Sequence, residues 1–182
     1  MIITDFNKFF EAEKSGKLYK YGVVMLYLDI PNWKNITDKI SRDDIYLPND
    51  PTHGTENNPH VTVLYGLHKE VQEKDIREIL IKSGIKTINI ETDGISIFEN
   101  DEFDVVKIGV ISEELTFLNK EISKLPHTTD YPDYKPHMTI SYVNPKCGNK
   151  YIDKNLKIKL KSSKIIYKMT NGQRVEFNLN NI

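Results

Sequence analysis

Hydrophobic positions divide the first half of the chain into strands and amphipathic helices. Residues 21–30 form a dense apolar run that predicts a buried strand, and residues 5–14 place three phenylalanines at helical spacing. A short helix with one apolar face is expected to begin at Asn32. Residues 71–83 again carry apolar side chains at helical spacing, and Gly84 is a natural C-terminal stop. This half of the chain therefore alternates strands with helices.

The second half of the chain is dominated by hairpins. Residues 88–98 and 103–110 predict two strands joined by a tight turn, and Ser112 is a suitable N-cap for the helix that follows. An Asn-Gly pair at 171–172 accepts positive φ angles, so it predicts a hairpin between two further strands. We therefore expect an α+β fold with largely antiparallel sheet, organised as one domain over 1–182.

Charge is unevenly distributed along the chain. The formal net charge is −1, yet the segment 146–168 contains eight lysines and one aspartate and so carries +7. Such a segment can attract a phosphate-bearing ligand, whereas lysines on an exposed strand can also simply discourage pairing between sheet edges. Both interpretations stay open at this point.

The cysteine content and the lengths of the apolar runs indicate in which compartment the protein works. The single cysteine, Cys147, excludes an intramolecular disulfide and suits a reducing compartment. The N-terminus shows no secretory signal pattern, and no apolar run reaches the length of a membrane span. We therefore expect a soluble cytoplasmic protein that does not associate with membranes.

One seven-residue pattern occurs twice in the chain. Residues 59–65 and 136–142 both follow Pro-His-apolar-Thr-apolar-x-Tyr. Side chains alternate between the faces of a strand, so the histidine and threonine of each motif point to one side and the apolar residues to the other. A lone histidine on a strand is usually structural, but the same polar face repeated in the same frame indicates a shared functional site. The repetition suggests two related lobes that face each other across a cleft.

The polar residues of the two motifs suit phosphodiester cleavage. They are His60, Thr62, His137 and Thr139. The pKa of histidine lies near neutrality, so one imidazole can accept a proton while the other donates one. Threonine hydroxyls can donate hydrogen bonds to phosphate oxygens and so stabilise charge that develops in the transition state. This chemistry requires no metal, and the sequence does not decide which histidine is the base.

Other catalytic chemistries lack their motifs. The chain has no His-x-x-x-His pair, no cysteine cluster and no carboxylate inside either motif to complete a metal site. It has no glycine-rich loop of the NTPase type, and nothing around Ser96 or Ser141 looks like a nucleophile elbow. The remaining histidines, His53, His68 and His127, are expected outside the two motif strands.

The two motifs resemble those of the two-histidine (2H) phosphoesterase superfamily, whose members carry two His-x-Thr/Ser motifs on strands lining a central cleft. Within it, residues 59–66, 96–107 and 125–137 are similar to phage anti-CBASS proteins, which degrade the cyclic di- and trinucleotide signals of bacterial immunity. The similarity spans about the middle half of the chain. It implies a bilobal 2H-phosphoesterase-like fold, with two pseudo-symmetric lobes of largely antiparallel sheet, flanking helices and a cleft between them.

The resemblance also implies roles for particular residues. His60 and His137 would form an acid-base pair, and Thr62 and Thr139 would bind phosphate, with no metal or other cofactor. In the phage proteins the attacking group is a ribose 2′-hydroxyl, which gives a 2′,3′-cyclic phosphate before hydrolysis. Members also bind substrate through groups outside the motifs, and the candidates here are Tyr19, Tyr21, Trp33, Tyr131, Tyr134 and Glu176.

One function hypothesis and two rivals follow. We predict a metal-independent phosphodiesterase that hydrolyses 3′-5′-linked cyclic di- and trinucleotides in the bacterial host cytoplasm, by which a phage evades CBASS defence. The first rival is an RNA-processing enzyme that acts on 2′,3′-cyclic phosphates or 2′-5′ linkages, and the lysine-rich segment slightly favours such a longer ligand. The second is a protein that sequesters nucleotides without turnover. Base preference, ring size, linkage and oligomeric state are not determined by the sequence.

Overall fold

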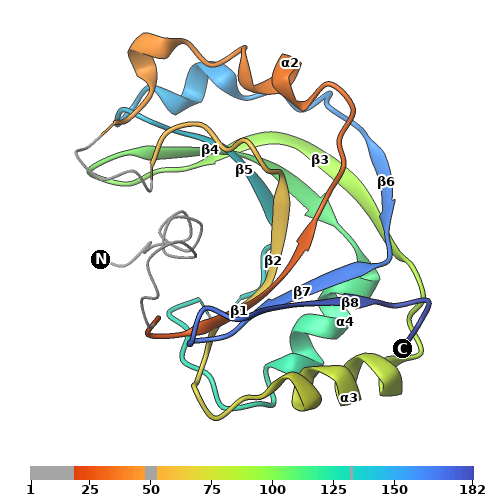
Figure 1. The fold of residues 1–182 in the computed structure, drawn as a ribbon. Coiled ribbons are helices and arrows are strands. Elements are labelled where there is room, and N and C mark those ends of the chain that lie inside the picture. Colours follow the sequence, from red (N-terminus) through yellow and green to blue (C-terminus); the bar gives the residue numbers. More distant parts are fainter. Residues whose placement is uncertain (1–18, 48–52, 132) are drawn as a thin grey trace.

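The computed structural model describes residues 19–47, 53–131 and 133–182 (Figure 1). Within these ranges the chain forms two four-stranded sheets in which every strand pair is antiparallel. The predicted α+β class with largely antiparallel sheet is therefore confirmed. The helix expected over 5–14 lies outside the described residues.

Each sheet places a motif strand at one edge. In spatial order, the first sheet consists of β2 (His60–Leu67), β1 (Gly22–Tyr27), β7 (Lys164–Lys168) and β8 (Arg174–Asn178). The second sheet consists of β5 (His137–Val143), β4 (Asp104–Ile111), β3 (Ile88–Phe98) and β6 (Lys159–Ser162). The edge strand of each sheet thus begins with a motif histidine. This equivalence agrees with the bilobal 2H-phosphoesterase-like fold expected from the sequence.

Helices connect the two lobes. The helical elements are α2 (Trp33–Thr37), α3 (Glu73–Ser83), α4 (Glu113–Ile122) and two short 3-10 turns, η1 (Arg42–Asp44) and η2 (Gly148–Tyr151). Helix α4 packs against α3 and contacts both β2 and β3, so it joins the two sheets (Figure 1). No helix in the described part of the chain is long and apolar enough to cross a membrane.

Local sequence signals account for the helix ends. The Ser112 side chain accepts a hydrogen bond from the Leu115 amide at 3.2 Å, which satisfies one of the free N–H groups at the start of α4. Gly84 follows α3 in the left-handed conformation, with a φ of 65°, as its place after the apolar pattern predicted. Helix α2 ends at Thr37, whereas the apolar spacing extended to Ile40, which is buried beyond the helix end.

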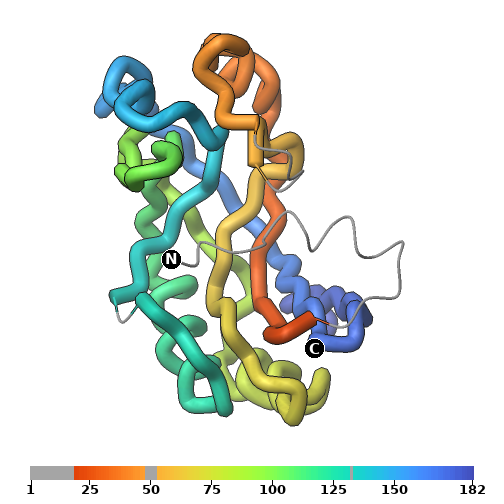
Figure 2. The backbone as a smooth tube through the Cα atoms, turned by 90° about the vertical axis from the view of Figure 1, so that its left-hand side faces the viewer, coloured from red at the N-terminus to blue at the C-terminus, as the bar shows by residue number. Residues whose placement is uncertain are grey.

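One hydrophobic core is shared by both sheets and by α3 and α4. It includes the fully buried residues Leu26, Ile76, Ile108, Leu118 and Met138. Each sheet has one face toward this core. Its other face lies on the concave side of the arc that the strands form in Figure 1. Figure 2 shows β2 and β5 running side by side, so the two motif strands meet where the sheets adjoin.

The lysine-rich segment separates into two environments. Its strand β6 is the edge of the second sheet, and Lys159 and Lys161 are exposed there, where they oppose pairing with another strand. Strand β7 is instead an inner strand of the first sheet, and Lys168 at its end is 1% exposed. Lys157 and Lys164 form ion pairs with Asp93 and Glu176, so the segment is less basic than its sequence implies.

Candidate active site

The two motif histidines occupy equivalent places in the two lobes. His60 opens β2 opposite Tyr27 of β1, and His137 opens β5 opposite Gly109 of β4. The apolar residues of both motifs are fully buried in the core: Val61, Val63, Met138 and Ile140. Because side chains alternate along a strand, the histidines and threonines lie on the opposite, concave face.

Both imidazoles are held in the same way by the backbone. The Nδ1 atom of His60 lies 2.8 Å from the carbonyl oxygen of Asn58, and Nδ1 of His137 lies 2.8 Å from that of Lys135. A carbonyl only accepts hydrogen bonds, so Nδ1 carries the proton in each ring. The neutral imidazole therefore presents an unprotonated Nε2, the atom that a general base needs.

The His60 side chain is buried, with 6% of its surface exposed. Burial lowers the pKa of His60 from 6.5 to about 4, and the positive charges of His137 and Lys168 act in the same direction. The hydrogen bond to Asn58 opposes this shift. His60 is therefore neutral at physiological pH, and the strand that it opens, β2, contacts β5, the strand that His137 opens.

A buried carboxylate lies beside His60. Glu56 is 8% exposed, and its Oε2 atom lies 3.8 Å from Nδ1 of His60. Its Oε1 atom accepts a hydrogen bond from the Asn58 amide at 2.8 Å, and burial raises the pKa of Glu56. Glu56 thus shapes the turn that presents the Asn58 carbonyl. It also faces the ring on which positive charge would form if His60 accepted a proton.

His137 has different neighbours. It is half-buried, and its ring meets the Phe98 ring edge-on with centroids 5.1 Å apart. Burial lowers the pKa of His137, the backbone hydrogen bond to Lys135 raises it, and the positive charge of Lys107 lowers it. Lys107 itself stands opposite Thr139 in the neighbouring strand.

The motif threonines occupy partly exposed positions beside inner strands. Thr62 lies opposite Met25 of β1, and Thr139 opposite Lys107 of β4. The Tyr134 hydroxyl donates a hydrogen bond to the carbonyl of Thr62 at 3.0 Å, and burial raises the pKa of Tyr134. Tyr134 thus ties the segment before β5 to the motif strand of the other lobe.

Two of the predicted substrate-binding aromatics lie near the start of β1. Tyr19 packs with Tyr27 and Tyr65 in an apolar cluster on the face of the first sheet that carries His60. Tyr21 meets Tyr65 edge-on, with centroids 5.9 Å apart, and stacks on His68 at 6.0 Å. Their role in binding stays a prediction.

The other candidates are more widely separated. Trp33 is 8% exposed, and its Nε1 atom donates to the Glu56 carbonyl at 2.7 Å, so it supports the segment that carries Glu56. Tyr131 is 61% exposed in the loop before β5. Glu176 is exposed on β8 and pairs with Lys164 at 3.1 Å. A direct role in ligand binding is untested for all three.

The remaining histidines lie outside both motif strands. His53 packs against aromatic rings of the second lobe, including Phe103 and Tyr142. His68 approaches the Thr128 hydroxyl at 2.8 Å just after β2. The Nδ1 atom of His127 lies 2.9 Å from the Leu125 carbonyl, which repeats the backbone contact of the motif histidines in a loop.

No group of three or more His, Cys, Asp or Glu residues that could hold a metal ion occurs in the described part of the chain. Charges near the two imidazoles come from residues that sequence reasoning missed: Glu56, Lys107 and Lys168. Glu56 falls in a polar stretch with no repeating pattern. Lys107 did carry a signal, because a charged residue interrupts an otherwise apolar strand over 105–108.

The fold of this chain can be compared with that of solved structures. Among solved structures, Usb1 of Kluyveromyces marxianus has a similar fold, with a TM-score of 0.57 and 11% sequence identity. The similarity covers 88% of this chain and 98% of that chain. A search of curated proteins finds no match.

A family model provides the more specific result. The model described as anti-CBASS protein Acb1 matches residues 50–169, about two thirds of the chain, and the matched region contains both His-x-Thr motifs. The chain therefore belongs to the family of anti-CBASS protein Acb1.

Proposed function

We propose that this protein is a phosphodiesterase that opens 3′-5′-linked cyclic di- and trinucleotides by histidine acid-base catalysis, and that a phage uses it to evade CBASS defence. Membership of the Acb1 family supports the biological role. The observation that carries the chemistry is the matched pair of imidazoles: both are held through Nδ1 by a carbonyl two residues earlier, on equivalent edge strands.

The surroundings of the two rings support a division of roles. His60 is neutral at physiological pH because burial lowers its pKa to about 4, so its Nε2 is ready to accept a proton. The proton it gains would be stabilised by the Glu56 carboxylate, 3.8 Å from Nδ1. We therefore assign His60 as the base and His137 as the acid.

The proposed reaction is a transesterification followed by hydrolysis. His60 removes the proton from a ribose 2′-hydroxyl, whose oxygen attacks the adjacent phosphorus to form a 2′,3′-cyclic phosphate. The P–O bond to the 5′ oxygen breaks, and His137 donates a proton to that leaving oxygen. Water then opens the cyclic phosphate with the two roles reversed. Thr62 and Thr139 donate hydrogen bonds to the phosphate oxygens and stabilise the charge that builds on them.

A substrate panel tests this proposal. Pure protein is incubated, with EDTA present, with cyclic di- and trinucleotides, a 2′,3′-cyclic mononucleotide and a short RNA, and the products are identified by mass. Linear products from the cyclic oligonucleotides are expected. Recovery of unaltered but bound ligand would indicate sequestration, and turnover of RNA alone would indicate RNA processing. Loss of activity in EDTA would reject the metal-free mechanism.

A further inference from the structure

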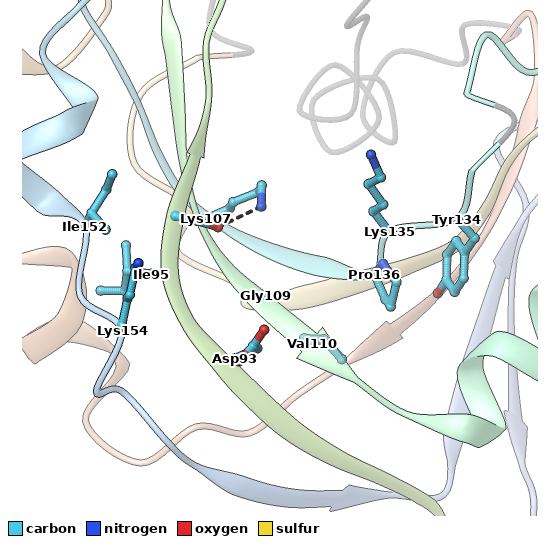
Figure 3. Close-up of a pocket in the computed structure, with 11 residues that line it drawn as sticks. Asp93, Ile95, Lys107, Gly109, Val110, Tyr134, Lys135, Pro136, Ile152 and Lys154 are labelled. Carbon is cyan, nitrogen blue, oxygen red and sulfur yellow. Dashed lines mark hydrogen bonds between the residues drawn. The ribbon is translucent and has the colours of Figure 1, made fainter.

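A pocket lies on the second lobe beside His137. It has a volume of about 640 Å³ and is lined by Lys107, Gly109, Tyr134 and Lys135, among others. Figure 3 shows it between strand β4 and the segment that leads into β5. Gly109 stands opposite His137 in the sheet and has no side chain to fill this space. The four motif residues do not line the pocket, but Pro136 and Gly109, which do, are the chain neighbour and the sheet partner of His137, so the pocket adjoins the candidate active site.

Lys107 is a cation of the pocket whose ammonium group contacts other side chains. It is half-buried, its Nζ atom donates a hydrogen bond to the Ser96 hydroxyl at 2.8 Å, and it lies 4.2 Å from the centre of the Phe98 ring. The hydrogen bond draws the ammonium group toward β3 and away from β5. The Phe98 ring also contacts the His137 ring, so it lies in contact with both the ammonium group and the imidazole.

The positive charge of Lys107 is not neutralised by the protein. Burial and the positive charge of Lys135 both lower the pKa of Lys107. Within the described part of the chain, no carboxylate forms an ion pair with Lys107 or Lys135, and the one acid that lines the pocket, Asp93, pairs with Lys157 at 2.7 Å. Lys107 is half-buried next to the exposed Lys135, so its charged form is disfavoured by both burial and repulsion, and a bound anion would offset both effects.

We infer that Lys107 and Lys135 form a second phosphate-binding subsite, which holds a phosphate of the ligand other than the one positioned between the histidines. This inference rests on the proposed function. Its consequence is selectivity: ligands with two or more phosphodiesters occupy both sites, whereas a cyclic mononucleotide occupies only the site at the histidines. Charge-assisted hydrogen bonds from ammonium groups give this subsite its affinity.

Binding measurements without turnover test the subsite. In the His60→Ala background, calorimetry compares cyclic di-AMP, which has two phosphates, with 3′,5′-cyclic AMP, which has one. Adding Lys107→Met is expected to raise the Kd of cyclic di-AMP by about 10- to 100-fold, the loss expected for a hydrogen bond to a charged group, while the Kd of cyclic AMP changes little. Lys135→Met should also raise the Kd of cyclic di-AMP. Because Lys135 is exposed, this variant replaces Lys107→Met in the test if Lys107→Met fails to fold.

A matched control is Lys82→Met on α3, an exposed lysine remote from the pocket, which should change neither Kd. An equal loss of affinity for both ligands would place Lys107 on the reacting phosphate and overturn the inference. An unchanged Kd of cyclic di-AMP in Lys107→Met, or no detectable binding of cyclic di-AMP, would also overturn it. Hydrolysis by the wild-type protein is measured separately. If turnover fails while the selective binding loss is seen, the subsite stands and only the proposed catalytic function falls.

Discussion

The two histidine motifs share a backbone frame and differ in the charges around their rings. His60 is 6% exposed and has the buried carboxylate of Glu56 beside Nδ1. His137 is half-buried, and its ring lies near Phe98 and within electrostatic reach of Lys107. Among the described residues, no carboxylate lies within ion-pair distance of His137. Duplicated geometry thus coexists with unequal electrostatics.

This difference supports the division of roles proposed for the two histidines. A ring that gains a proton during the reaction benefits from a nearby negative charge, which His60 has. A ring that donates a proton has to be protonated first: Lys107 lowers the pKa of His137, so a smaller fraction of the rings is protonated, but each protonated ring is a stronger acid. Four predictions test this comparison, in order of decreasing effect.

The largest effect is expected from removing either imidazole. His60→Ala or His137→Ala should lower kcat on a cyclic dinucleotide by about a hundred- to ten-thousand-fold, because each ring carries one proton transfer in the proposed mechanism. Initial rates measured in EDTA provide the test. His127→Ala is the matched control, since His127 makes the same backbone contact outside the motif strands, and its rate should not change. A motif variant with near wild-type activity would contradict the pairing.

Burial of neutral His60 should make stability depend on pH. With a pKa lowered from 6.5 to about 4, the unfolded chain binds a proton that the native protein does not over this interval, so the free energy of unfolding falls as pH falls. The full contribution is about 3 kcal/mol. Between pH 7 and pH 4, the free energy of unfolding measured in urea should therefore decrease less in His60→Gln than in wild type. An identical decrease in the two proteins would contradict the neutral state of His60.

Glu56→Gln tests the electrostatic difference between the lobes. Glutamine can still accept the hydrogen bond from Asn58, but it removes the negative charge near His60, so kcat should fall about tenfold, equivalent to about one pKa unit. The acid limb of the pH profile should move to lower pH, because His60 becomes harder to protonate. Glu70→Gln, which changes a carboxylate 3.5 Å from His68, is the control. An unchanged pH profile would leave Glu56 with a purely structural role.

The smallest effect concerns the contact between the lobes. Tyr134→Phe removes the hydroxyl that donates to the Thr62 carbonyl and should lower the free energy of unfolding by about 1 kcal/mol, the usual value of one hydrogen bond. Tyr131→Phe changes an exposed tyrosine in the same loop and should have no effect. Chemical denaturation of both variants makes the comparison, and equal stabilities would show that the contact contributes nothing.

Much of the secondary structure could be read from the sequence because the apolar pattern is strong. The strands predicted over 88–98 and 103–110 appear as β3 and β4, the second displaced by one residue. The helix expected over 71–83 begins two residues later, where Gln72 and Asp75 form a capping box. Helix ends were less predictable, because hydrogen bonds from capping groups compete with the apolar spacing that indicates the helix.

The sequence by itself determined the duplicated motif, its two polar faces and the α+β class, since these follow from alternation along single strands. Only the tertiary structure decided the surroundings of each ring: Glu56 reaches His60 through a turn, and Lys107 reaches the site from a neighbouring strand. Burial and charge are sums over atoms from distant parts of the chain. No local pattern records them, so the unequal electrostatics of two nearly identical motifs emerged only when the chain was folded.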